Sequence, residues 1–138
     1  MLIFNMGNIQ SMKKISFEDM LYSIDNKYTI ITVINDMNSC MIQGTVPIIN
    51  EESVINNYYN NNNLSLPIII YGYNSCDENI VKKYKQLTEL GFKNVYVYPG
   101  GIFEWLLLQD IYTTKFIKTN KTELNLLKYK PNNILKLN

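Results

Sequence analysis

The sequence contains no histidine, no arginine and no alanine, and it has two cysteines among its 138 residues. Because histidine is absent, no side chain has an ordinary pKa close to neutrality. Because arginine is absent, no guanidinium group can hold an oxyanion through paired hydrogen bonds. Mechanisms that need an imidazole base or an arginine clamp are therefore excluded for this chain.

Concentrated charge is missing as well. The chain has 13 basic and 12 acidic residues, which give a net charge of +1, and the lysines are spread along its length. A nucleic-acid or membrane-surface partner requires a concentrated basic face. We therefore expect neither nucleic acid nor a membrane as a partner. Which protein or small molecule the chain binds, and whether copies of it form a homo-oligomer, stay open.

Long apolar runs are also absent, since none approaches the ~18 residues that a membrane-spanning helix needs. The N-terminal "MLIFNM" is too short for the apolar core of a signal peptide and has no charged stretch before it. We therefore expect a cytoplasmic protein in a reducing compartment, with either Met1 or Met12 as its natural start.

The two cysteines, Cys40 and Cys76, do not define a metal site. Without histidine or clustered acids, two cysteines cannot supply four zinc ligands at a recognised spacing. Both cysteines end an "NSC" triplet, which we interpret as coincidence in a chain rich in asparagine. The sequence therefore predicts no metal and no cofactor.

The length of the chain suits one domain and is too short for two ordinary ones. Residues 1–14 lack a clear period over most of their length and are predicted to form an N-terminal lead-in. The domain itself is predicted over residues 15–112. Residues 113–138 are expected to form a C-terminal extension, whose short helix near 122–131 packs on the domain and ends at Pro131.

Three nearly continuous apolar runs, "YTIITVIN", "LPIIIYG" and "KNVYVYPGG", predict strands that are covered on both faces. Between them, apolar residues three and four apart predict helices. We expect strands near 29–34, 67–71 and 94–98, and helices near 17–25, 51–59, 78–90 and 102–109. This alternation predicts an α/β fold: a three-layer α/β/α sandwich with a central, mainly parallel sheet.

Two segments of the chain resemble the rhodanese-like domain family. "PIIIYG" (67–72) is similar to the family's central strand, and "GFKNVYVYPGGIFEW" (91–105) is similar to the stretch that follows its next helix. A weaker similarity covers "IQGTVPIIN" (42–50). The resemblance extends over about residues 15–112 and implies a rhodanese-like, three-layer fold.

The resemblance also implies an active-site design. In the sulfurtransferase branch of the family, a cysteine at the end of the central strand carries a persulfide, which loop amides and an arginine surround. Backbone donors, a helix N-terminus and positive charge keep such a thiolate ionised and reactive. Aligned on the strand, the cysteine position holds Gly72, and the arginine position holds Asp77 or Glu78. The active-site cysteine and arginine are therefore not in their usual positions.

These substitutions predict a catalytically degenerate domain, a pseudoenzyme, that acts as a binding or structural module. Its binding loop is expected to consist of Gly72, Tyr73, Asn74, Ser75, Cys76, Asp77 and Glu78. The alternative is a sulfurtransferase or redox sulfur carrier in which Cys76 is a displaced catalytic nucleophile. A nearby helix N-terminus favours a reactive thiolate at Cys76, whereas the two adjacent acids and the absence of a histidine base oppose it.

Overall fold

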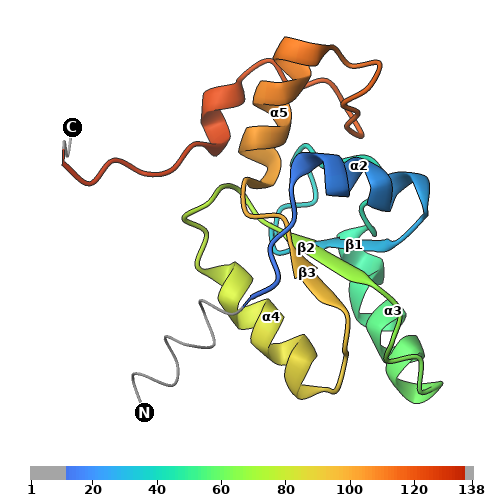
Figure 1. The fold of residues 1–138 in the computed structure, drawn as a ribbon. Helices are drawn as coiled ribbons and strands as arrows, with labels where there is room; N and C mark the ends of the chain where they lie inside the picture. The colour runs from blue at the N-terminus through green and yellow to red at the C-terminus, as the bar shows by residue number, and fades with distance from the viewer. Residues whose placement is uncertain (1–11, 136–138) are drawn as a thin grey trace.

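The computed structural model of the chain describes residues 12–135 (Figure 1). Most of the predicted lead-in, including Met1, lies outside the described residues. In chain order the elements are α2 (Phe17–Asp25), β1 (Thr29–Thr32), α3 (Ile48–Asn60), β2 (Ile68–Tyr71), α4 (Asn79–Glu89), β3 (Val95–Val97), α5 (Gly101–Tyr112) and the 3-10 helix η1 (Leu126–Tyr129).

The strands β1, β2 and β3 lie side by side in that order and are parallel, with Ile30 opposite Ile69. A single parallel bridge extends the sheet at each edge. Lys14 pairs with Val97 of β3, and Thr45 pairs with Ile30 of β1. Parallel neighbours need a crossover connection, and α3 and α4 provide the two crossovers. The predicted parallel sheet is confirmed.

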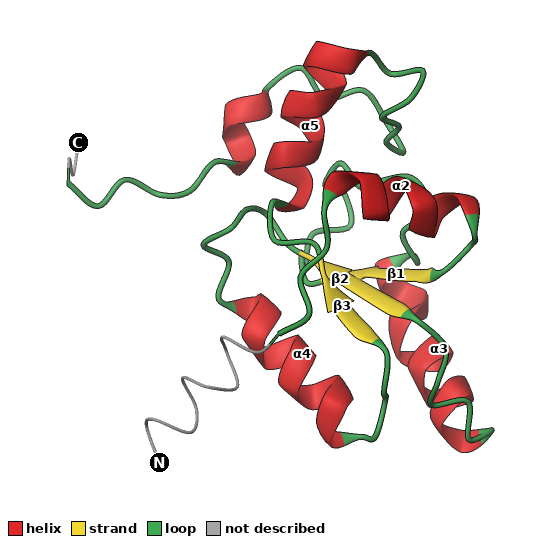
Figure 2. Cartoon of the chain, viewed as in Figure 1, coloured by secondary structure: helices red, strands yellow, loops and turns green. Residues whose placement is uncertain are grey.

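Helices cover both faces of the sheet (Figure 2). One apolar core lies beneath α2 and α5 and contains Met20, Ile69, Tyr71 and Trp105. The other lies beneath α3 and α4 and contains Ile55, Ile68, Ile70 and Leu87. Successive residues of β2 therefore point to opposite cores, as the two-residue period of a strand requires. This arrangement confirms the predicted three-layer α/β/α sandwich.

Three helix boundaries differ from the sequence predictions. The helix predicted over 51–59 begins at Ile48, directly after Pro47, because the fixed φ of proline suits the start of a helix. The helix predicted over 78–90 begins at Asn79, so Glu78 precedes it. The last helix is a single 3-10 turn rather than a helix over 122–131.

The C-terminal extension pairs with the loop that follows β1. Thr119 forms an antiparallel bridge with Ile42, and the indole Nε1 of Trp105 donates to the carbonyl of Lys118 at 2.9 Å. Ile117 is 1% exposed and belongs to the core beneath α2 and α5. The extension therefore contributes to the core, while its boundary at residue 112 stays a prediction.

None of the helices within residues 12–135 is long and apolar enough to cross a membrane. The longest, α3, has 13 residues, whereas a bilayer requires about 20. The cytoplasmic location expected from the sequence stays a prediction.

Candidate functional site

The predicted binding loop, residues 72–78, follows β2 at the carboxyl edge of the sheet, where open α/β sheets bind their ligands (Figure 1). The first amides of α5 hold its start: Ile102 N donates to Gly72 O and Phe103 N donates to Tyr73 O, both at 3.0 Å. Gly101 makes this approach possible, because its φ is +65° and a Cβ there would collide with the carbonyl oxygen of Gly72.

The carboxylate of Asp77 turns back into the loop. Its Oδ2 accepts a hydrogen bond from Tyr73 N at 3.0 Å, and its Oδ1 accepts one from Asn79 N at 3.0 Å. Asn79 N is among the amides at the start of α4, which have no partner within the helix and favour a negative charge. Asp77 therefore supplies, from within the chain, the anion that this loop can hold.

The same carboxylate closes the position where the family resemblance implies a nucleophile. A Cβ added to Gly72 would collide with Asp77 Oδ2 and would lie 2.9 Å from Asp77 Cγ and 3.0 Å from Val33 Cγ2. Such distances are well inside van der Waals contact. A cysteine at position 72 therefore requires the side chain of Asp77 to move.

Three other loop residues are exposed. Cys76 is exposed, and its amide donates to the side-chain oxygen of Asn74 at 2.9 Å. Ser75 and Glu78 are also exposed. Within the described part of the chain, Cys76 forms no disulfide, and no group of side chains could hold a metal ion.

A cleft of about 720 Å³ lies between the loop and the C-terminal segment. From the loop it is lined by Tyr73, Asn74, Cys76, Asp77 and Glu78, together with Asn79; from the other side it is lined by Asp36, Lys128, Tyr129, Lys130, Asn132 and Ile134. Five of the seven residues predicted for the binding loop thus line one cleft. Gly72 and Ser75 do not.

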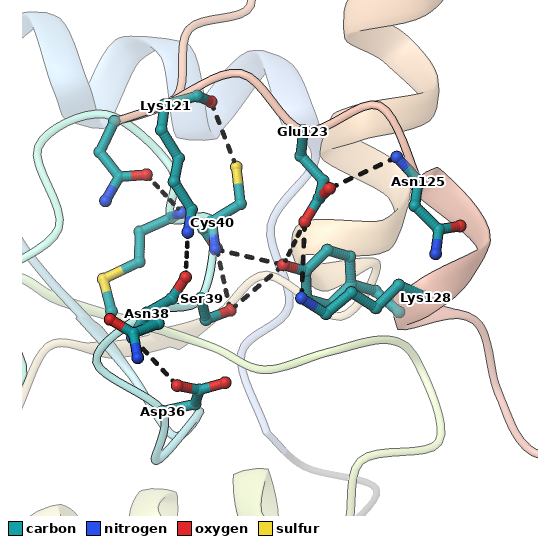
Figure 3. Close-up of polar contacts among 11 residues, drawn as sticks. Asp36, Asn38, Ser39, Cys40, Lys121, Glu123, Asn125 and Lys128 are labelled. Atoms are coloured by element: carbon teal, nitrogen blue, oxygen red, sulfur yellow. Dashed lines mark hydrogen bonds and ion pairs between the residues drawn. The ribbon is translucent and has the colours of Figure 1, made fainter.

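Tyr129 connects the loop after β2 with the loop after β1. Figure 3 shows Ser39 and Cys40 of the loop after β1 near Glu123 of the C-terminal segment. Its side chain is 2% exposed, and its ring stacks on Tyr73 with 5.9 Å between centroids. Its hydroxyl accepts from the amide of Cys40 at 3.2 Å and from Ser39 Oγ at 3.5 Å, and donates to Glu123 Oε1 at 3.0 Å. One aromatic side chain therefore joins three segments that are distant in sequence.

Burial and hydrogen bonding determine the charge states of Tyr71, Tyr73, Cys40 and Glu123. Burial raises the pKa of Tyr71 to about 12, and it also raises the pKa of Tyr73 and of the Cys40 thiol. The hydrogen bond from Tyr129 lowers the pKa of Glu123. At neutral pH the two tyrosines and Cys40 are therefore uncharged, and Glu123 is a carboxylate.

Comparison with known proteins identifies the family. The model of the rhodanese-like domain matches residues 25–108. The chain belongs to the rhodanese-like domain family. No curated protein matches the sequence. The match includes the whole loop 72–78, so the loop described above is part of the rhodanese-like domain.

Two solved structures share the rhodanese-like fold. The crystal structure of the Alr3790 protein from Anabaena sp. aligns with a TM-score of 0.55 and 20% identity, covering 83% of this chain and 86% of that one. The solution NMR structure of the rhodanese-like domain from the same protein aligns with a TM-score of 0.55 and 19% identity, covering 91% and 89%. At this identity the likeness establishes the fold.

Sequence reasoning missed Tyr129 and its partners in the loop after β1. Tyr129 lies in "LLKYKP", where a lysine on each side suggests a solvated segment. Its hydroxyl bonds to Cys40, which is 89 residues away, and a contact of that separation leaves no local pattern. The available signal was an isolated aromatic residue just before Pro131.

Proposed function

We propose that this rhodanese-like domain is a pseudoenzyme that binds a partner through residues 72–78 and does not transfer sulfur. The observation that carries the proposal is the position of Asp77. Its carboxylate accepts a hydrogen bond from the amide of Tyr73 and occupies the space that a side chain at position 72 would need. A persulfide needs vacant donors and positive charge around it. At this position it would meet a carboxylate instead.

Glu78 adds to this argument, because a second acid follows Asp77 and also lines the cleft. Like charges a few ångströms apart repel each other. The two carboxylates therefore disfavour binding of an anionic sulfur donor such as thiosulfate in the cleft. The cleft keeps aromatic and amide groups, from Tyr73 and Asn74, that suit the recognition of a partner.

A sulfurtransferase assay tests the proposal. We expect purified protein mixed with thiosulfate and cyanide to form thiocyanate no faster than a Cys76→Ser variant does. Turnover at the level of an active rhodanese, abolished by Cys76→Ser, would overturn the proposal and establish Cys76 as the nucleophile.

The second candidate function, a redox sulfur carrier working through Cys76, is favoured by one observation: the residue is exposed and lines the cleft. The rate of alkylation by iodoacetamide at neutral pH discriminates between the two. An incidental thiol should react at the rate of a free model thiol, whereas a catalytic thiolate should react much faster.

A further inference from the structure

The C-terminal segment already places a side chain against the proposed binding loop. We call residues 123–131 the strap. Among the described residues 123–135, Tyr129 is the single fully buried one, whereas Leu124 and Leu127 are 89% and 62% exposed. Leu126 is half-buried and packs against the same core. The strap is therefore attached to the domain through Tyr129, with Leu126 beside it.

The contacts of Tyr129 are those of a bound peptide residue. Its ring stacks on Tyr73 with an angle of 22° between planes. Its backbone carbonyl accepts from the side-chain nitrogen of Asn74 at 2.9 Å. Its hydroxyl lies among the amide of Cys40, Ser39 Oγ and the Glu123 carboxylate. This niche, formed by Ser39, Cys40, Tyr73 and Asn74, thus recognises an aromatic ring, a main-chain carbonyl and a phenolic hydroxyl together. Glu123, which accepts from the hydroxyl, belongs to the strap itself.

Two features separate the attachment of the strap from that of the rest of the extension. Among residues 12–135, the one ion pair of the strap joins Lys128 to Glu123 at 3.7 Å and lies within the strap itself. The extension is joined to the domain before the strap begins, through the bridge of Thr119 and the buried side chain of Ile117.

We propose that the strap is a tethered ligand that occupies the binding loop in the free protein, and that the external partner is a peptide segment that presents a tyrosine to the same niche. This inference rests on the proposed function, because it names the partner class and the regulation of the same loop. The partner must displace Tyr129, so its apparent affinity equals its intrinsic affinity multiplied by the fraction of molecules in which the strap is open.

A peptide of residues 122–133, "TELNLLKYKPNN", serves as the probe. Labelled with a fluorophore and titrated with full-length protein, it should bind Tyr129→Ala about tenfold or more tighter than wild type, because the variant leaves the niche vacant. Tyr59→Ala, which removes a half-exposed tyrosine on α3, should behave as wild type. The same peptide carrying Tyr129→Ala should bind none of the proteins.

Equal binding to wild type and Tyr129→Ala, or no binding to a Tyr129→Ala variant that remains folded, would overturn the inference. Hydrogen exchange of wild-type protein gives a test that needs no variant. The Cys40 amide, which donates to Tyr129, should exchange by local opening and faster than the Tyr98 amide, which donates to Ile70 O within the sheet.

Equal exchange of these two amides would mean that the strap opens only on global unfolding, which would also overturn the inference. Neither measurement involves sulfur transfer. Failure of the strap inference is therefore distinguishable from failure of the proposed function, which the thiocyanate assay decides.

Discussion

At the scale of single residues, the Asp77 carboxylate caps the start of α4 and also supplies the negative charge that the loop amides hold. Its two carboxylate oxygens accept hydrogen bonds from the amides of Tyr73 and Asn79. Asp77→Ala leaves both donors without that partner, so we expect it to lower the free energy of unfolding by about 0.5–2 kcal/mol. Urea denaturation measures this. Glu78→Ala, at an exposed neighbour whose side chain does not cap α4, is the matched control and should change stability by less than about 0.5 kcal/mol.

Glu123 gives a prediction for pH. Its pKa is lowered by the hydrogen bond from Tyr129 and by Lys128 and Lys121. Because the pKa of Glu123 is lower in the folded state, its charge stabilises the fold at any pH above the ordinary glutamate pKa. This stabilisation is lost as the pH falls through the lowered pKa. Thermal unfolding of wild type and Glu123→Gln should therefore differ at pH 7 and converge once the pH has fallen below the lowered pKa of Glu123. A difference that is the same at both pH values would contradict this assignment.

At the scale of elements, the junction between the binding loop and α5 depends on Gly101. Its φ of +65° and its contact with the Gly72 carbonyl leave no room for a Cβ. We expect Gly101→Ala to destabilise the domain by more than about 1 kcal/mol in urea denaturation. Gly44→Ala is the control and should cost less, because Gly44 also has a positive φ, +90°, but a Cβ there would meet only Ile30 Cδ1 at 3.8 Å, an ordinary contact. Equal effects of the two substitutions would argue against this account of the junction.

The elements themselves were predictable, whereas the site was predictable only in part. The continuous apolar runs and the helical periodicity identified three strands and most helices, because local patterns encode burial on both faces of a sheet. The resemblance placed the loop at Gly72 and the acid at Asp77. It did not reveal that the carboxylate turns back onto Tyr73, since that direction depends on how α5 packs against the loop. Tyr129 escaped detection because its partners are distant in sequence.

At the scale of the whole molecule, the C-terminal extension is needed for the core. Deleting residues 113–138 removes Ile117 and Tyr129, which are 1% and 2% exposed, and the carbonyl partner of Trp105. Burial of each such side chain contributes about 1.5–3 kcal/mol, within a total stability of only about 5–15 kcal/mol. We expect the deletion to lower the melting temperature sharply or to abolish cooperative unfolding by circular dichroism.

Deleting only residues 132–138 is the control for that experiment. The described residues of this shorter segment are exposed, so its removal should leave the melting temperature nearly unchanged. If both deletions were equally harmless, the extension would be an appendage rather than a part of the core.

The central claim is that the Asp77 carboxylate occupies the space beside Gly72 where an active rhodanese-like domain would hold its nucleophile, and a double-mutant cycle on folding stability tests it most directly. Gly72→Ala in wild type should cost about 1–3 kcal/mol from overpacking against Asp77. In the Asp77→Ala background the same substitution should cost much less, because of the atoms nearest the new Cβ only Val33 Cγ2 remains. The account predicts a coupling energy of about 0.5–3 kcal/mol between the two positions in urea denaturation. Additive effects of the two substitutions would show that the carboxylate does not occupy this position, and would contradict the account.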